Sequence, residues 1–153
     1  MNEQTPVPSI SEYEKILFLC DLALFTKTAE NLSNIEIYEF LQSLYREIES
    51  EIKKSKGIIV KHMGDSTLAV FDPTDLKETI AALKELKIKI QMWLQETKFR
   101  ECKFRIKLHL GSVVESKIGE PQQYDIFGKA VHELFKIPFE DFKTSAAIVA
   151  KLW

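Results

Sequence analysis

The spacing of apolar residues along the chain predicts an alternation of strands and helices. A nearly continuous apolar run over residues 15–20 has the length of a buried strand, and it ends at Asp21. After it, apolar residues recur every three or four positions from Ser33 onward, and Ser33 with Glu36 forms a capping box. We therefore expect a long amphipathic helix that begins at Ser33 and is ended by Gly57.

Two short runs of strand-forming residues, 58–63 and 66–71, flank Gly64 and predict a β-hairpin. A second amphipathic helix is expected to open at residue 72, followed by a further strand over 102–111. The resulting order β-α-β-β-α-β is that of the split βαβ, or ferredoxin-like, arrangement. The fold class predicted is thus α+β with a ferredoxin-like core.

This strand order brings two carboxylates together. Asp21 closes the first strand and Asp65 immediately precedes the third, and these two strands pair antiparallel in the ferredoxin-like arrangement. Both side chains should then lie at the same solvent-facing edge of the sheet, where they repel each other unless a cation such as Mg²⁺ or Mn²⁺ lies between them. The spacing alone leaves a second interpretation open, in which both are turn and cap residues in water.

Composition narrows the class of protein. A chain of 153 residues suits one compact domain, so we expect a flexible N-terminal segment over 1–12 and a single domain over 13–153. With 45% hydrophobic residues and a net charge of −2 it lacks the basic excess of nucleic-acid-binding proteins, so nucleic acid is not an expected partner. No leader peptide or membrane-spanning run is evident, which predicts a cytoplasmic protein.

Cysteine and histidine offer no metal site by their spacing. Cys20 and Cys102 fall in apolar runs without a partner at ligand spacing, and we expect buried, reduced thiols. His62 and His109 likewise lack a carboxylate or cysteine at ligand spacing, so we interpret both as structural.

Four blocks of the sequence, in order and at the expected separations, resemble the catalytic domain of the class III adenylate and guanylate cyclases: FLCDLALFT, VKHMGDSTLAVF, RIKLHLGSVV and PQQYDIFGKAVHELFK. The resemblance covers Ile16 to Lys136, and QYDIFG is especially close to the adenylate cyclase form. It implies a cyclase that converts ATP to cyclic AMP and pyrophosphate and works as a head-to-tail homodimer. A heterodimer with a more complete cyclase is the alternative assembly.

The resemblance also implies roles for individual residues. Asp21 and Asp65 correspond to the carboxylates that hold two metal ions, Mg²⁺ or Mn²⁺. Lys61 and Asp125 fall on the base-recognition positions. Asp125 can accept from the 6-amino group of adenine while Lys61 donates to N1, whereas guanine offers the reverse pattern, so ATP should be preferred to GTP.

Further positions of the family match are Phe25 and Thr26, which follow the first metal carboxylate and are expected to bind substrate. His132 stands where the family has the Asn that positions the ribose, and Lys136 where it has the Arg that meets the charge building on the α-phosphate. We take these two as the catalytic residues of this chain. Lysine keeps the charge but loses the guanidinium fork, so some rate should be lost.

Other departures favour a second interpretation. Leu24 replaces a Gly of the family in the turn near the phosphates, and the sequence stops before the terminal hairpin that supplies a further phosphate-binding lysine. The rival is therefore a catalytically inactive nucleotide-binding or regulatory dimerisation module. A polymerase palm or diguanylate cyclase would need a GGDEF-like turn, of which only Gly64 and Asp65 are present. The sequence as a whole predicts a weak adenylate cyclase.

Overall fold

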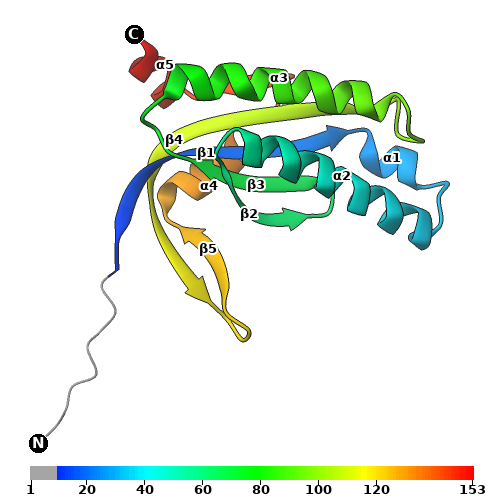
Figure 1. The fold of residues 1–153 in the computed structure, drawn as a ribbon, viewed down its shortest axis with the longest axis horizontal. Helices are drawn as coiled ribbons and strands as arrows, with labels where there is room; N and C mark the ends of the chain where they lie inside the picture. Colours follow the sequence, from blue (N-terminus) through cyan, green and yellow to red (C-terminus); the bar gives the residue numbers. More distant parts are fainter. Residues whose placement is uncertain (1–9) are drawn as a thin grey trace, which may run out of the picture.

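The computed structural model describes residues 10–153, which form a six-stranded sheet with helices on both faces (Figure 1). The elements in chain order are β1 (Glu12–Ala23), α1 (Phe25–Ala29), α2 (Asn34–Lys54), β2 (Ile58–Met63), β3 (Ser66–Phe71), α3 (Leu76–Leu94), β4 (Lys103–Ile118), β5 (Gln123–Phe127), α4 (Lys129–Lys136), β6 (Phe142–Thr144) and α5 (Ala146–Leu152).

The strand order β2-β3-β1-β4-β5, with β6 added parallel to β4, contains the predicted ferredoxin-like core. In that core β1 pairs antiparallel with both β3 and β4, which confirms the predicted α+β fold. The division into a segment 1–12 and a domain 13–153 stays a prediction, because residues 1–9 lie outside the described part. Within residues 10–153, every helix is too short or too polar to cross a membrane.

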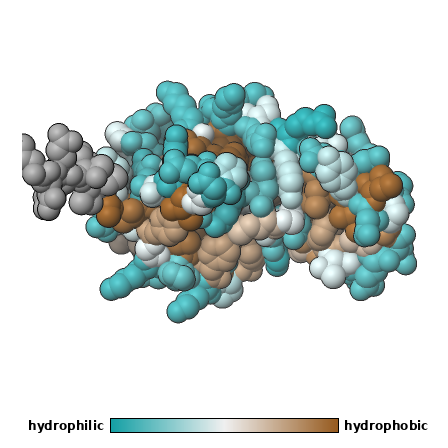
Figure 2. Space-filling model, turned by 90° about the horizontal axis from the view of Figure 1, so that it is seen from below, coloured by the Kyte–Doolittle hydropathy of each residue, from teal (hydrophilic) through white to brown (hydrophobic). Residues whose placement is uncertain are grey.

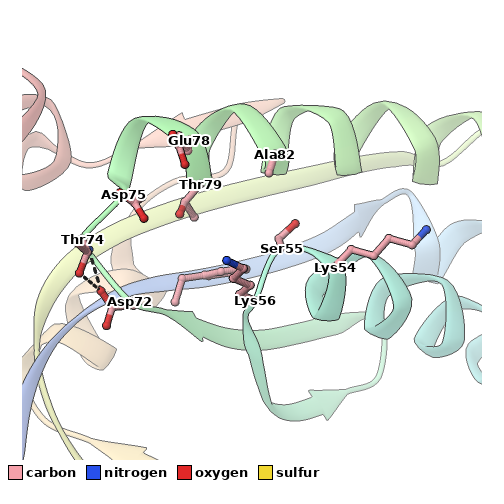
Figure 3. A pocket seen from close by; sticks show the side chains of 10 residues that line it. Lys54, Ser55, Lys56, Asp72, Thr74, Asp75, Glu78, Thr79 and Ala82 are labelled. Carbon is pink, nitrogen blue, oxygen red and sulfur yellow. Dashed lines mark hydrogen bonds between the residues drawn. The ribbon is translucent and has the colours of Figure 1, made fainter.

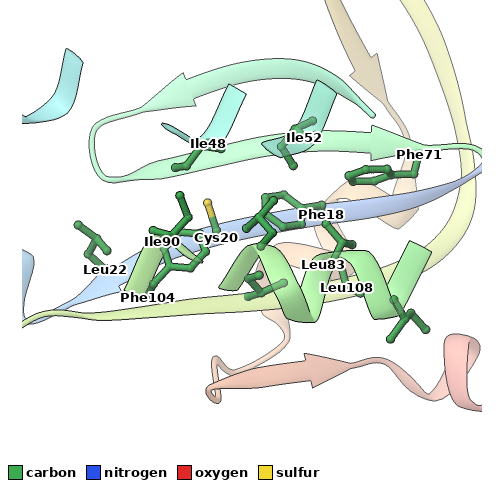
Figure 4. Close-up of a cluster of buried hydrophobic side chains, with 14 of the residues drawn as sticks. Phe18, Cys20, Leu22, Ile48, Ile52, Phe71, Leu83, Ile90, Phe104 and Leu108 are labelled. Atoms are coloured by element: carbon green, nitrogen blue, oxygen red, sulfur yellow. The ribbon is translucent and has the colours of Figure 1, made fainter. Parts of the chain in front are cut away.

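β1 is apolar along its whole centre because both of its faces are covered. Ile16, Phe18 and Cys20 point into the larger core beneath α2 and α3, which also takes Phe71 from β3 and Phe104 from β4 (Figure 4). The residues between them belong to a second cluster on the opposite face, made by Leu17, Leu19, Leu68, Val70, Val113, Ile126, Ala130 and Leu134. A strand buried on both faces reads as a continuous apolar run.

α4 lies on this second face and packs directly on β4. A Cβ at Gly111 would lie 2.5 Å from the Cβ of Ala130, so only glycine lets the helix approach the strand this closely. The helix begins after Gly128, whose φ of 138° is one that other residues rarely adopt. Two glycines therefore set the position of the helix that carries His132 and Lys136.

β4 is long enough to pair with β1 along its first part and with β5 along its last part. Its first part pairs with β1 as far as Val114, and its last part, Val114 to Ile118, pairs with β5. In Figure 1 this last part curves away from the main sheet together with β5 and comes down beside β2. The two ends of the strand order, β2 and β5, are thus brought into contact.

Several expected boundaries differ from the structure. β1 and β4 extend well past the predicted runs, because pairing along a neighbour continues the strand through polar residues. α3 begins at Leu76 rather than at residue 72, since Asp72 instead accepts the backbone N–H of Thr74 in a local turn. Both cysteines are buried free thiols as expected, and burial raises the pKa of Cys20 to about 12.

The end of α2 also differs from expectation. The capping box of Ser33 and Glu36 is present at its start. At its end, however, Lys56 rather than Gly57 adopts the left-handed conformation, with φ 62°. Gly57 is needed for space instead, because a Cβ there would lie 2.4 Å from the ring of Phe71.

This difference predicts opposite effects for two neighbouring substitutions. Gly57→Ala should lower the free energy of unfolding by about 1–3 kcal/mol through overpacking against Phe71. Lys56→Gly should leave it unchanged or raise it by up to about 1 kcal/mol, because glycine adopts a positive φ without strain. Urea denaturation measures both, and a Gly57→Ala variant as stable as the parent would contradict the packing argument.

Candidate active site

The pairing of β1 with β3 brings Asp21 and Asp65 to one edge of the sheet. The paired register runs from Ile16 opposite Phe71 to Cys20 opposite Thr67, so Asp21 lies one residue beyond it. Oδ2 of Asp65 accepts a hydrogen bond of 3.1 Å from the backbone N–H of Leu22. The two carboxylates are therefore neighbours, as the strand order predicts, while their role as metal ligands stays a prediction.

A cation that the sequence analysis missed lies against this pair. Arg105 of β4 is the register partner of Asp21, and its Nε and Nη2 donate to the two carboxylate oxygens at 2.8 and 2.6 Å. Asp21 is consequently only 16% exposed, not free at a solvent-facing edge. The expected repulsion between the carboxylates is offset by a side chain of the same protomer.

The charges at this edge perturb one another. Burial raises the pKa of Asp65, and the charge of Asp21 adds to the shift, against the opposing hydrogen bond from Leu22. The bond to Asp21 raises the pKa of Arg105. Burial thus disfavours the charged form of Asp65, while the hydrogen bond to Asp21 favours the charged form of Arg105.

α2 holds the turn that carries Asp65. The hydroxyl of Tyr45 donates to the carbonyl of Gly64 at 2.6 Å, and its ring stacks on His62 with 3.9 Å between ring centroids. His62 also bonds to Thr67 and to Glu49, both at 2.8 Å. The structural interpretation of His62 thus fits its contacts, although it has a carboxylate partner that sequence spacing could not reveal.

Lys61 and Asp125 meet where the two ends of the sheet come together. Nζ of Lys61 lies 3.1 Å from Oδ2 of Asp125, and the other oxygen of Asp125 accepts from the backbone N–H of Ile126. A cavity of about 300 Å³ opens beside the pair, lined by the β4–β5 turn, Val60 and Tyr124 among others. A hydrogen-bond donor, Lys61, and an acceptor, Asp125, thus lie side by side at the opening of this cavity.

Phe25 and Thr26 lie in α1, directly after Leu24. The ring of Phe25 is partly buried and stacks on Phe99, with ring centroids 5.3 Å apart, so it takes part in packing the core. Thr26 is exposed. Leu24 has φ 69°, a left-handed conformation that glycine adopts without strain, so the turn keeps the backbone shape of a glycine position.

His132 and Lys136 are both exposed on α4, one turn apart. Within residues 10–153 neither side chain makes a hydrogen bond or ion pair with Asp21, Asp65, Lys61 or Asp125. The two pairs and the two helix residues are thus not assembled into one site in a single copy of the chain.

Lys107 and His109, two polar residues of β4, hold α4 in place. Nζ of Lys107 donates to the carbonyls of Phe135 and Ile137 at 3.1 and 2.7 Å, at the C-terminal end of the helix. His109 bonds to Glu133 at 2.7 Å and to Ser145 at 2.8 Å. The side chains of Lys107 and His109 are both buried, so they contact the helix rather than the solvent.

Large apolar side chains remain exposed on the elements around these residues. Examples are Ile58 on β2, Ile118 and Phe127 on the β4–β5 hairpin, and Phe135 on α4. Figure 2, which views the molecule from below, shows apolar surface interrupted by polar side chains. Such a mixed surface resembles the non-obligate interfaces of proteins.

Another hollow, of about 460 Å³, lies elsewhere, between the end of α2 and the start of α3. Figure 3 shows Lys54 and Lys56 on one side of it and Asp72, Asp75 and Glu78 on the other. Its charges are of both signs and contact solvent, and none of the site residues predicted from the sequence lines it. We therefore place the candidate site at the carboxylate pair and at Lys61–Asp125.

The carboxylate pair has the donor chemistry of a divalent-cation site, since carboxylate oxygens are the ligands that Mg²⁺ prefers. A cation already lies on both oxygens of Asp21, which indicates that the position suits positive charge. Among residues 10–153 no group of three or more His, Cys, Asp or Glu side chains is gathered as a ready metal cage. Any metal held here would take its remaining oxygen ligands from water or from a bound phosphate.

Comparison with known sequences identifies related proteins. Residues 9–134 match the model of the adenylate and guanylate cyclase catalytic domain. An adenylate cyclase from Anabaena cylindrica is 27% identical over 144 residues, which is 88% of this chain and 29% of that protein. The chain thus spans less than a third of that relative's length.

Comparison with solved structures supports the same fold. The guanylyl cyclase Cya2 superposes with a TM-score of 0.81 at 20% identity, covering 92% of this chain and 79% of that one. The guanylyl cyclase domain of the RhoGC fusion protein from Blastocladiella emersonii, solved as an unconventional dimer, gives a TM-score of 0.76 at 18% identity, covering 92% and 84%. By its sequence match over most of its length, this chain belongs to the family of adenylate and guanylate cyclase catalytic domains.

Proposed function

We propose that this domain is a weak adenylate cyclase that converts ATP to cyclic AMP and pyrophosphate at the interface of a dimer. The observation that carries the proposal is that one folded cyclase domain holds both the Asp21–Asp65 pair and the Lys61–Asp125 pair. In the reaction, the ribose 3′-hydroxyl oxygen attacks the α-phosphorus, a cyclic phosphodiester forms, and pyrophosphate leaves. Positioning and charge neutralisation supply the catalysis.

Asp21 and Asp65 would hold the divalent cations, Mg²⁺ or Mn²⁺. Two such ions, when bound, activate the 3′-hydroxyl and hold the triphosphate. Asp65 keeps its carboxylate in place through the N–H of Leu22, while Tyr45 holds the carbonyl of the preceding Gly64. The exposed Thr26 and the neighbouring Phe25 would face the phosphates.

Lys61 and Asp125 would select the base. In the absence of nucleotide they satisfy each other at 3.1 Å, which keeps the donor and the acceptor within reach of one planar ligand edge. Adenine can bond to both side chains, because its N1 accepts from Lys61 and its 6-amino group donates to Asp125. Guanine leaves both mismatched, at a cost of about 1–3 kcal/mol for each unpaired group.

A second copy of the chain would complete the site. His132 and Lys136 are exposed and, within residues 10–153, make no hydrogen bond or ion pair to Asp21 or Asp65, so a head-to-tail partner could present them to the other nucleotide. The exposed apolar residues of β2, the β4–β5 hairpin and α4 suit such an interface. A heterodimer with a more complete cyclase would use the same surfaces.

The alternative is a nucleotide-binding or regulatory dimer without turnover. Lys136 and the positive φ of Leu24 favour it, because a point charge replaces a bidentate contact and a leucine side chain crowds the turn expected near the phosphates. ATP would then bind without reacting.

Cyclic AMP formation from Mn²⁺-ATP tests the proposal directly. Asp65→Asn keeps an acceptor for the N–H of Leu22 but loses the charge, so product formation should fall about a hundredfold or more. Asp72→Asn, the same change at the other end of β3, should leave it unaltered. A parent protein that binds ATP but makes no cyclic AMP would favour the alternative.

Base selection has its own test. Asp125→Asn can donate to the 6-oxo group of guanine, so the ratio of ATP to GTP affinity, measured by calorimetry with Mn²⁺, should fall about tenfold, which corresponds to about 1.4 kcal/mol. Glu120→Gln, in the lining of the same cavity, is the matched control and should preserve the ratio. Equal affinity of the parent protein for ATP and GTP would contradict base selection by Lys61 and Asp125.

The departures on α4 predict a gain of function. His132→Asn with Lys136→Arg should raise cyclic AMP formation by about one to three orders of magnitude at nearly unchanged ATP affinity, because the bidentate contact acts chiefly in the transition state. Lys129→Arg, at the exposed start of the same helix, should have no effect. If the double variant dimerises and binds ATP but makes no more cyclic AMP than the parent, His132 and Lys136 do not limit the rate. Leu24 is then the next residue to test.

A further inference from the structure

Lys107 is a lysine that β4 carries into the interior, where only 3% of its surface is exposed. Its Nζ donates to the carbonyl of Phe135 at 3.1 Å and to the carbonyl of Ile137 at 2.7 Å. Lys136 is the residue between these two carbonyls, at the last position of α4. A single ammonium group therefore holds the backbone immediately before and immediately after Lys136.

The C-terminal end of α4 takes this donor from outside the helix. The last carbonyls of a helix have no partner within it and form the negative end of its dipole, so a cation placed there is favourable. Beyond Lys136 the chain leaves the helix at once. Ile137 is extended, with ψ 125°, as is usual for a residue before proline, and Pro138 has no N–H to donate. Lys107 supplies the donor from the neighbouring strand.

The surroundings of Lys107 accommodate a charged side chain although it is buried. Burial lowers the pKa of its ammonium group, because the charged form loses hydration. Two carbonyl oxygens and the ring of Phe139, whose centre lies 4.2 Å from Nζ, replace that hydration. Around it this face of the sheet is packed mainly with apolar residues, among them Leu19 and Leu134. The helix end that it binds explains why a cation is buried among them.

We propose that Lys107 is a positioning residue for the reaction, which places Lys136 by holding the carbonyls of Phe135 and Ile137. The side chain of Lys136 is exposed, so the backbone at the end of α4 rather than packing decides where its ammonium group can reach. A displacement of about 1 Å at such a group can cost about a hundredfold in rate. The proposal rests on the proposed function, in which Lys136 meets the charge that builds on the α-phosphate.

Steady-state kinetics with Mn²⁺-ATP give the first test. Lys107→Met nearly keeps the length of the side chain but removes the ammonium group, so kcat should fall by a factor of about 10 to 100. KM should rise no more than about threefold, because the contact of Lys136 acts chiefly in the transition state. Lys129→Met, the same change at the exposed start of α4, should alter neither constant.

A double-mutant cycle shows whether Lys107 acts through Lys136. In a Lys136→Ala background, Lys107→Met should cost no further loss of kcat, because the group that it positions is gone. The same loss of kcat in that background as in the parent would show that Lys107 supports the active site independently of Lys136. That result would overturn the proposal.

Hydrogen exchange separates failure of this proposal from failure of the proposed function, because it needs no turnover. The amide protons of residues 133–139 should exchange about tenfold faster in Lys107→Met than in the parent, while those of α2 stay unchanged. Unchanged exchange over 133–139 would overturn the positioning role, whether or not the parent makes cyclic AMP. Faster exchange in a parent that makes no cyclic AMP would overturn the proposed function and leave Lys107 a purely structural residue.

A second variant keeps the test decisive if Lys107→Met does not fold. Lys107→Gln retains a neutral donor group at shorter reach, so it should lie between the parent and Lys107→Met both in kcat and in the exchange of residues 133–139. A kcat equal to that of the parent in every folded variant of Lys107 would overturn the proposal.

Discussion

The pairing of β1 with a strand on each side is the constraint on which the rest of the structure depends. Because β1 is buried on both faces, its register cannot shift by one residue without exchanging the two apolar clusters. That register places Asp21 opposite Arg105 on one side and next to the turn of Asp65 on the other. The charge balance of the candidate site is therefore set by core packing rather than by local loop structure.

The same pairing explains which parts could be read from the sequence. Hydrophobic periodicity and the capping box of Ser33 predict the core elements, since each depends on residues close together in the chain. The neighbouring positions of Asp21 and Asp65 follow from topology alone. Boundaries were less predictable, because β1 and β4 continue as far as their partners allow and because Lys56, not Gly57, adopts the left-handed conformation at the end of α2.

The contacts that the sequence did not reveal all join distant elements. Arg105 on β4 reaches Asp21 on the neighbouring strand β1, far away in the sequence, and Lys107 and His109 reach the helix that follows the β4–β5 hairpin. In the sequence these three residues are the polar positions of an alternating strand, and the alternation does not indicate which element covers them. Lys107 and His109 are buried only because α4 packs closely on β4 at Gly111.

β4 consequently links the parts of the candidate site. Its residues hold Asp21 through Arg105, support the C-terminal half of α4 through Lys107 and the His109–Glu133 pair, and lead into the hairpin that brings Asp125 to Lys61. Arg105 and Lys107 share the ring of Phe139, so the carboxylate edge and the end of α4 are in continuous contact. Substitutions on β4 are therefore expected to disturb the carboxylate edge and the end of α4 together.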